Sequence, residues 1–335
     1  TPPLDTQIGG ERLTTQLIDV TVTDGEYSFG FDLLDRWVEM CDRVGIKYFE
    51  IAHLFTQWGA KHAPKIMATV DGEYKQIFGW KTRANSKKYK KFLLDFSAEL
   101  KAYLEERNLR DKVLIHVSDE SMLRSYSKAS KYIHKLFEGY KIVDALSDYK
   151  FYKLKIVSNP IPANDHIDKF LGNVKNLWVY YCSAQKNHYV SNRFFCNESL
   201  RTRIIGYQMY KYGIKGFLHW GYNFYYTRLS KAPIDPFENS DAGKAFPSGD
   251  SYIVYPAKDG TPYHSIRFKV FYDALQDMAA LNTLEKLTDK NTCLNIIEEC
   301  GRHNLTFRDY PHDENWMLTT REKVNALISS RIKGE

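Results

Sequence analysis

The sequence has few cysteines and no long apolar run, and both absences exclude classes of protein. Its 335 residues include 5 cysteines, and none of them form a C-x-x-C pair. This pattern indicates neither a disulfide framework nor a zinc ribbon. No segment approaches the roughly 18 continuous apolar residues of a membrane-spanning helix. We therefore expect no membrane partner.

Several short catalytic signatures are also missing. The chain has no G-x-G-x-x-G and no G-x-x-x-x-G-K-[ST] after any expected strand, so nothing marks a phosphate-binding loop. It has no H-E-x-x-H, and His166, His188 and His219 lack an i, i+4 partner of the ligand type. The nucleophile elbow G-x-S-x-G is absent as well. We expect no metal and no cofactor.

The charge is modest and dispersed. The formal net charge is +6, and the densest basic patch, Lys87-Lys88-Tyr89-Lys90-Lys91, opens an expected helix. Such a patch is more typical of a solvated helix face than of a nucleic-acid interface, which concentrates its positive charge. We expect no nucleic-acid partner. The aromatic share of 15% suits either carbohydrate stacking or an aromatic core.

What is present is an alternation of amphipathic helices and short apolar strands. The periodicity predicts helices at 31–44, 89–105, 122–138, 164–174, 199–212 and 265–287. It predicts strands at 46–51, 112–117, 141–147, 177–182, 214–220 and 251–255. This order is typical of a parallel α/β fold, either an open doubly wound sheet or a closed barrel.

Polar and aromatic residues follow many of the expected strands, at positions far apart in the sequence. They are His53, Asp119, Glu120, Asp144, Ser147, Tyr181, Trp220 and Asn223. A barrel gathers all its strand ends around one pocket, whereas an open sheet gathers only those at its switch point. The pattern favours a closed barrel of parallel strands.

In the segment VLIHVSDES (113–121), two adjacent acids, Asp119 and Glu120, follow a short apolar run. Most glycosidases place two carboxylates about 5 to 10 Å apart across the scissile bond, a spacing that Asp119 and Glu120 fit poorly. The pair suits a different division of roles, in which one acid protonates the leaving oxygen and the other orients a nucleophile of the substrate. The alternative is structural: Ser118 caps a helix whose first turn carries both acids.

Two further segments could contact a sugar. His53 and Trp58 lie in IAHLFTQWGA, and Trp220, Tyr222 and Asn223 lie in GFLHWGYNFYY. Such side chains can hydrogen-bond sugar hydroxyls and stack on an apolar ring face. Filling the core is an equally good explanation for both segments.

These motifs resemble glycoside hydrolase family 123, the β-N-acetylgalactosaminidases, and related uncharacterised bacterial proteins. The matching stretches cover nearly the whole chain in the family's order: TPPLDTQIGGERLTTQL, YFEIAHLFTQWGAKHAPKI, IFGWKT, IHVSDE, LWVYYC, NRFF, YKYGIKGFLHWGYN, DSYIVYPAKDG and SIRF. The resemblance implies a (β/α)8 barrel that removes terminal β-linked N-acetylgalactosamine with retention, by substrate-assisted catalysis.

The resemblance also implies roles. Glu120 would be the general acid/base, and Asp119 would orient the 2-acetamido group that attacks the anomeric carbon. Tyr181 would donate a hydrogen bond to the acetamido oxygen. The implied sugar contacts are His53, Trp58, Trp220, Tyr222 and Asn223. The implied partner is a glycan or glycoconjugate substrate. Hydrolysis of another glycoside and non-catalytic carbohydrate binding are the alternatives.

Family members carry a β-sandwich and the first part of the barrel before the TPPLDT motif, where this chain begins. We therefore expect an N-terminally truncated chain whose barrel lacks its first strand or strands, and a β-sandwich segment in the full-length protein. We expect residues 1–335 to form a single catalytic barrel domain, with 265–335 as its helical C-terminal part. The sequence is compatible with both a cytoplasmic and a cell-surface or secreted location.

Overall fold

The structure, a computed structural model, describes residues 15–57, 59–118, 123–313 and 315–334. It is a mixed α/β structure, which confirms the α/β class expected from the alternating pattern. The chain forms two compact units: Thr1–Pro160 with Leu229–Ala232, and Ile161–Arg228 with Pro233–Glu335. Along the described parts of the chain, no helix is long and apolar enough to cross a bilayer.

A four-stranded sheet forms the centre of the first unit. Its strand order is β3(Phe49–Ile51), β6(Val113–Ile115), β7(Lys141–Ala145) and β8(Asn159–Ile161). β6 pairs in parallel with both β3 and β7. All residues of β6 are buried, as expected for a strand that is covered on both faces. None of the described sheets closes on itself, so closure into a barrel stays a prediction.

Helices precede and follow these strands. They are α1(Asp32–Arg43), α2(Lys87–Glu106), α3(Leu123–Leu136) and the short α4(Tyr149–Lys153), with the 3-10 turn η1(Arg110–Lys112) before β6. In α1, Leu34, Val38 and Cys41 are buried at helical spacing. Gly45 follows the helix with φ +80, the left-handed conformation expected where a helix ends in glycine.

The first unit also contains a second sheet, which the sequence pattern did not predict. Its strand order is β2(Glu26–Gly30), β1(Asp19–Thr23), β4(Ile66–Val70) and β5(Glu73–Phe78). The hairpins turn at Asp24-Gly25 and Asp71-Gly72, where all four residues have positive φ. Asp-Gly in a two-residue loop is a strong hairpin signal, because such turns need left-handed backbone at both positions.

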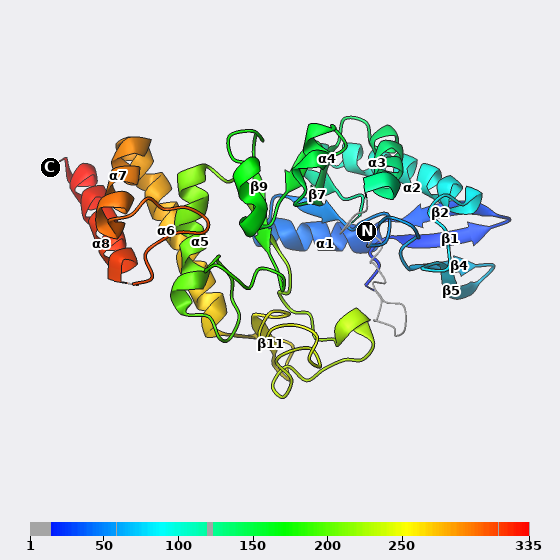
Figure 1. Cartoon of the computed structure of the whole chain (residues 1–335). Helices are drawn as coiled ribbons and strands as arrows, with labels where there is room; N and C mark the ends of the chain where they lie inside the picture. The colour runs from blue at the N-terminus through cyan, green and yellow to red at the C-terminus, as the bar shows by residue number, and fades with distance from the viewer. Residues whose placement is uncertain (1–14, 58, 119–122, 314, 335) are drawn as a thin grey trace. The chain divides into compact units, whose positions relative to one another are not determined.

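Helix α2 lies beside β2 of this sheet (Figure 1), and aromatic side chains pack between the two. The Phe92 ring lies 5.2 Å from that of Tyr27 and 5.1 Å from that of Phe78. Ser86 caps the helix by accepting the backbone N–H of Tyr89 at 3.3 Å. Much of the chain's aromatic content therefore fills a core.

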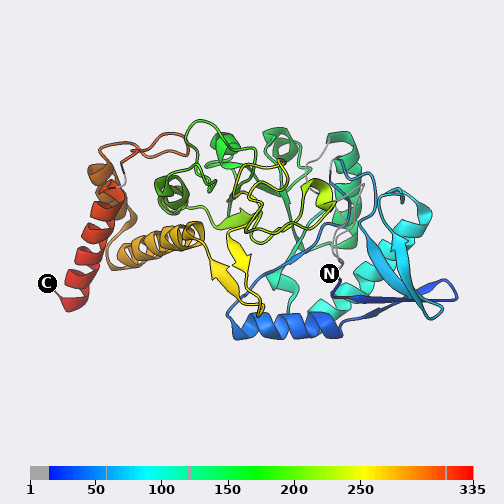
Figure 2. The same ribbon diagram turned by 90° about the horizontal axis from the view of Figure 1, so that it is seen from below.

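The second unit pairs β9(Trp178–Tyr181) in parallel with β10(Gly216–His219). An antiparallel hairpin of β11(Val254–Pro256) and β12(Pro262–His264) leads into α6(Ile266–Leu287), as Figure 2 shows. The remaining elements of this unit are α5(Ser199–Tyr212), α7(Lys290–Gly301), α8(Asn315–Lys333) and the 3-10 turn η2(Asn164–Lys169). The 3-10 turn η3(Arg228–Ser230) falls where the division between the two units crosses the chain.

The helix predicted at 164–174 is wrong, because only the 3-10 turn η2 forms there. The Asn164 side chain donates to the carbonyl of Ser191 at 2.8 Å, and Gly172 adopts φ +74. Short amide side chains that bond elsewhere compete with a regular helix, and a left-handed glycine ends one.

A buried carboxylate joins three helices of the second unit. Asp277 of α6 is ion-paired with Arg203 of α5 at 2.6 Å and with Arg321 of α8 at 2.8 Å. Helices α5 and α6 approach closely at Gly206, where an added Cβ would lie 2.0 Å from the carbonyl oxygen of Ala274. Helix α6 is therefore joined to α5 both by an ion pair and by a close backbone contact.

Candidate functional site

The acid pair predicted to carry the chemistry, Asp119 and Glu120, lies outside the described residues, and so does Trp58. The structure describes the strand end that leads to the pair. β6 ends at Ile115, and Val117 and Ser118 follow it, both buried. Of the other predicted site residues, His53 belongs to the first unit, and Tyr181, Trp220, Tyr222 and Asn223 belong to the second.

Asp144, in β7, holds the backbone after β6. It is fully buried, and its Oδ1 accepts the backbone N–H of Val117 at 3.0 Å and that of Ser118 at 3.4 Å. The hydroxyl of Tyr126, in α3, donates to its Oδ2. Burying a carboxylate is costly unless several donors surround it. The described backbone just before Asp119 is therefore attached to the neighbouring strand.

His116 joins this cluster between two carboxylates. Its Nδ1 lies 3.4 Å from Asp144 Oδ1, and its Nε2 lies 3.6 Å from Glu50 Oε2. Burial opposes the charged imidazole, but the hydrogen bonds and charges of Asp144 and Glu50 raise the pKa of His116 to about 10. The ring is therefore a cation at neutral pH and balances the buried carboxylate.

His53 lies beside this cation in the opposite protonation state. Its ring centroid is 5.9 Å from that of His116, in an edge-on arrangement. Burial, together with the charge of His116, lowers the pKa of His53 to about 3. Its Nδ1 has no hydrogen-bond partner among the described residues. A neutral imidazole with an unused nitrogen can accept one hydrogen bond from a hydroxyl group or donate one to it.

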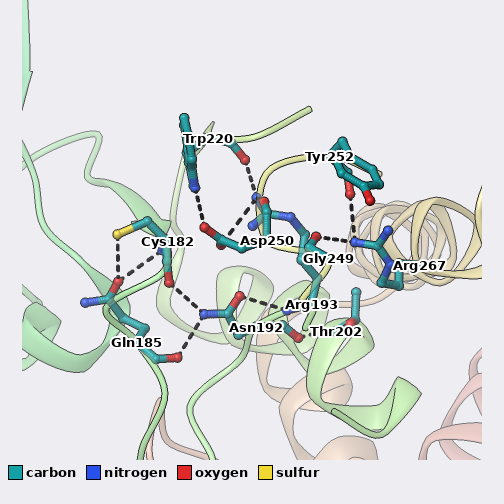
Figure 3. A network of polar contacts seen from close by, with 10 residues as sticks. All are labelled: Cys182, Gln185, Asn192, Arg193, Thr202, Trp220, Gly249, Asp250, Tyr252 and Arg267. Atoms are coloured by element: carbon teal, nitrogen blue, oxygen red, sulfur yellow. Dashed lines mark hydrogen bonds and ion pairs between the residues drawn. The ribbon is translucent and has the colours of Figure 1, made fainter. Parts of the chain in front are cut away.

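The second unit contains a buried polar network around Trp220, drawn in Figure 3. The indole N–H of Trp220 donates to Asp250 Oδ2 at 2.8 Å. Arg193 donates to the carbonyl oxygen of Trp220 and, at 2.6 Å, to that of Asp250. Trp220 is thus held through both its backbone and its ring nitrogen.

Arg193 also lies beside the ring of Tyr181, the residue predicted to contact the acetamido oxygen. Its guanidinium carbon lies 5.3 Å from the centroid of the Tyr181 ring. Arg193 is 1% exposed, and its Nε and Nη1, together with the Tyr181 hydroxyl, have no hydrogen-bond partner within the described part of the chain. Burial raises the pKa of Tyr181, and the charge of Arg193 opposes that shift. Unused buried donors are uncommon in folded proteins, and here three of them belong to Arg193 and its neighbour Tyr181.

The same network orders the loop that carries Arg193. The side-chain amide of Asn192 donates to the carbonyls of Cys182 at 3.0 Å and Gln185 at 2.8 Å (Figure 3). Thr202, in α5, donates to the carbonyl of Asn192 at 3.0 Å. Cys182 therefore lies in a hydrogen-bonded loop, and Asn192 ties that loop to both β9 and α5.

Tyr222 and Asn223 differ from their neighbours in being exposed. Tyr222 is 45% exposed, with its ring edge-on to His219 at 5.9 Å between centroids. Asn223 pairs with Tyr252 through a short antiparallel bridge. Both residues of the turn after Gly221 are thus reachable from solvent in the second unit.

Four residues in these clusters were absent from the predicted site: His116, Asp144, Arg193 and Asp250. Asp144 was recognised only as a polar residue at a strand end. The other three lie inside the motifs IHVSDE, NRFF and DSYIVYPAKDG, so the signal that could have found them was a charged or titratable residue within a matched motif. Within the described residues, no group of three His, Cys, Asp or Glu side chains could hold a metal ion.

Comparison with protein families matches residues 1–284 to the catalytic domain of glycoside hydrolase 123. Among solved structures, the chain is similar to a family 123 glycoside hydrolase from Clostridium perfringens, whose structural analysis addresses glycolipid glycan hydrolysis. The identity is 16% and the TM-score 0.63, over 95% of this chain and 57% of that one. The chain therefore shares that fold and spans 57% of that protein's length. Curated proteins give no match.

Proposed function

Because the chain belongs to glycoside hydrolase family 123, we propose that it removes terminal β-linked N-acetylgalactosamine from glycans with retention of configuration. The family match over residues 1–284, which includes the adjacent acids of VLIHVSDES, is the observation that carries this proposal. We also propose that residues 1–335 act as one catalytic (β/α) barrel domain, with 265–335 as its helical part.

The proposed reaction has two steps. In the first, Glu120 donates a proton to the glycosidic oxygen while the 2-acetamido oxygen attacks the anomeric carbon. The glycosidic bond breaks, the aglycone leaves, and an oxazoline-type intermediate forms. In the second, the Glu120 carboxylate takes a proton from water, and the resulting hydroxide opens the oxazoline. Two displacements at one carbon retain its configuration, with no nucleophile from the protein.

Asp119 is the proposed partner of the acetamido group. An ionised carboxylate that accepts the amide N–H increases the electron density on the acetamido oxygen and stabilises the positive charge that develops during its attack. This role explains why two acids are adjacent. Support comes from the strand end before them, where Asp144 binds the backbone N–H groups of Val117 and Ser118.

The proposed sugar contacts use the chemistry of each side chain. The unused hydroxyl of Tyr181 would donate to the acetamido oxygen, and the Trp220 ring would stack on the apolar face of the sugar. The remaining proposed contacts are His53, Trp58, Tyr222 and Asn223.

A panel of aryl glycosides tests the activity. We expect release of p-nitrophenol from the N-acetyl-β-galactosaminide, slower release from the N-acetyl-β-glucosaminide, and almost none from the β-galactoside, which lacks the acetamido nucleophile. Equal cleavage of the β-galactoside would exclude substrate assistance. Glycan binding measured by calorimetry without any turnover would instead indicate a non-catalytic carbohydrate-binding barrel.

Two variants test the roles of the acids. We expect Glu120→Gln and Asp119→Asn each to reduce turnover by about 100-fold or more, the usual contribution of a positioned acid or base. The matched controls are Glu138→Gln and Asp111→Asn, which make the same changes at exposed positions of the first unit. Turnover at the control level in either acid variant would refute its assigned role.

A further inference from the structure

A cavity of about 580 Å³ in the first unit has a strongly basic lining. Its described walls come from Phe55, segment 60–62, segment 83–85, the first turn of α2 and α3. The polar side chains among its described lining residues are those of Lys61, His62, Arg83, Asn85, Lys90, Ser125, Lys128 and Tyr132, and none of these described residues is a carboxylate.

The cavity lining carries four positive charges, those of Lys61, Arg83, Lys90 and Lys128. None of the four is ion-paired with a carboxylate of the described residues. The next residue in α2 shows the contrast: Lys91 binds Glu26 at 2.8 Å and Asp95 at 2.9 Å. Four like charges around one concavity repel one another and focus a positive potential on the space between them. An anion in that space would relieve the repulsion.

The backbone that carries these cations is fixed by hydrogen bonds. Ala84 donates its N–H to the carbonyl of Lys61 at 2.8 Å, and His62 pairs with Arg83 in an antiparallel bridge. The Tyr132 hydroxyl, in α3, donates to the carbonyl of Lys90, in α2, at 3.0 Å. The walls are thus joined to one another, and the cations do not depend on a free loop for their arrangement.

The same walls are tied to the strand end before the proposed acids. Phe55, which lines the cavity, donates its backbone N–H to the carbonyl of Val117 at 3.1 Å, two residues before Asp119 in the sequence. Ser125, which also lines the cavity, lies five residues after Glu120 in the sequence. The basic cavity therefore adjoins the described backbone on both sides of the acid pair.

We propose that this cavity binds an acidic group of the glycan, a carboxylate or a sulfate or phosphate ester, carried by a sugar other than the one removed. The proposal rests on the proposed glycosidase function. Lysine and arginine supply charge-assisted hydrogen bonds to such oxyanions, Asn85 and Ser125 add neutral polar groups, and the rings of Phe55 and Tyr132 offer apolar surface to the sugar.

Calorimetry on the whole chain tests binding, using an oligosaccharide that ends in β-linked N-acetylgalactosamine, the same oligosaccharide with one sulfated internal sugar, and inorganic sulfate. The test variant replaces three lining cations: Lys61→Gln, Arg83→Gln and Lys128→Gln. The control variant makes the same change in net charge at exposed positions outside the lining: Lys47→Gln, Lys131→Gln and Lys150→Gln. We expect the sulfated glycan to bind at least about tenfold more tightly than the neutral one, and this preference to be lost only in the first triple variant.

Equal binding of the two glycans, or equal loss in both triple variants, would overturn the proposal. Inorganic sulfate that binds as tightly as the sulfated glycan would show a site for free anions and overturn it too. Kinetics add a second readout: the ratio of kcat/KM for the sulfated over the neutral substrate should fall about tenfold in the first triple variant alone. Because calorimetry needs no turnover, a failure of the proposed glycosidase activity remains distinguishable from a failure of the anion site.

Discussion

Asp144 Oδ1 accepts the backbone N–H of Val117 at 3.0 Å, across the pair of strands that precedes the proposed acids. The same carboxylate accepts the N–H of Ser118 and the hydroxyl of Tyr126, and it is ion-paired with His116. One buried acid of β7 therefore joins the residues after β6 to α3, directly before Asp119 in the sequence.

We predict that Asp144→Asn destabilises the protein by about 3 kcal/mol, because it removes one partner of a buried ion pair and turns one acceptor oxygen into a donor. Denaturant unfolding of the two proteins at neutral pH measures the difference. Asp42→Asn, an exposed position in the same unit, is the control and should change the free energy of unfolding by less than about 0.5 kcal/mol. Similar values for both variants would contradict the structural role of Asp144.

A second prediction concerns pH. The pKa of His116 is raised to about 10 in the folded protein, above the value of about 6.5 expected when it is unfolded. The stabilisation from its proton is therefore fully present below about pH 6.5 and is lost as the pH rises through about 10. The groups that face His116 are Asp144, Glu50 and the neutral His53.

We therefore expect His116→Gln to be less stable than the wild type near pH 6, with a difference that shrinks steadily toward pH ~10. Urea midpoints at several pH values between these limits measure it. A difference that grows with pH would show that the imidazole is buried in its neutral form. The pKa of His53 is lowered to about 3, so its effect on stability has the opposite pH dependence. Its contribution to the free energy of unfolding is lost as the pH falls below about 6.5.

A third prediction uses the variant Tyr181→Phe to separate the effect of this hydroxyl on stability from its effect on turnover. Its hydroxyl is buried and makes no hydrogen bond to any described residue, so Tyr181→Phe should change the free energy of unfolding by less than about 1 kcal/mol. If the hydroxyl contacts the acetamido oxygen, turnover of the N-acetyl-β-galactosaminide should fall about tenfold or more.

The matched control is Tyr207→Phe, in α5 of the same unit. The Tyr207 hydroxyl donates to the carbonyl of Met317 at 3.2 Å, so its loss should cost about 1 kcal/mol of stability and leave turnover unchanged. The reverse pattern, an unstable Tyr181→Phe with normal turnover, would assign the hydroxyl a folding role.

A fourth prediction tests the contact between α5 and α6. Gly206→Ala places a Cβ 2.0 Å from the carbonyl oxygen of Ala274, so the helices must separate. We expect a loss of at least about 2 kcal/mol, although alanine is the better helix former. Gly301→Ala is the control, because its nearest contact is the side chain of Pro311 at 3.3 Å, and it should stay within about 1 kcal/mol. Thermal unfolding distinguishes the two variants.

The sequence-based expectations were most accurate for the long helices. The expected helix 199–212 matches the bounds of α5, and that at 89–105 lies within α2. They failed at the hairpins β1–β2 and β4–β5, although Asp24-Gly25 and Asp71-Gly72 carried a readable turn signal. They also failed at 164–174, where side chains bond to residues distant in sequence.

By itself, the sequence determined the α/β class and the family, because hydrophobic period and ordered motifs are local properties of the chain. Only the tertiary structure decided that Asp144 holds the backbone before the acid pair, that His116 is charged and His53 neutral, and that Arg193 packs beside Tyr181. Each of these depends on burial and on partners brought together by folding. Protonation states and unused hydrogen-bond donors have no counterpart in the spacing of residues along the chain.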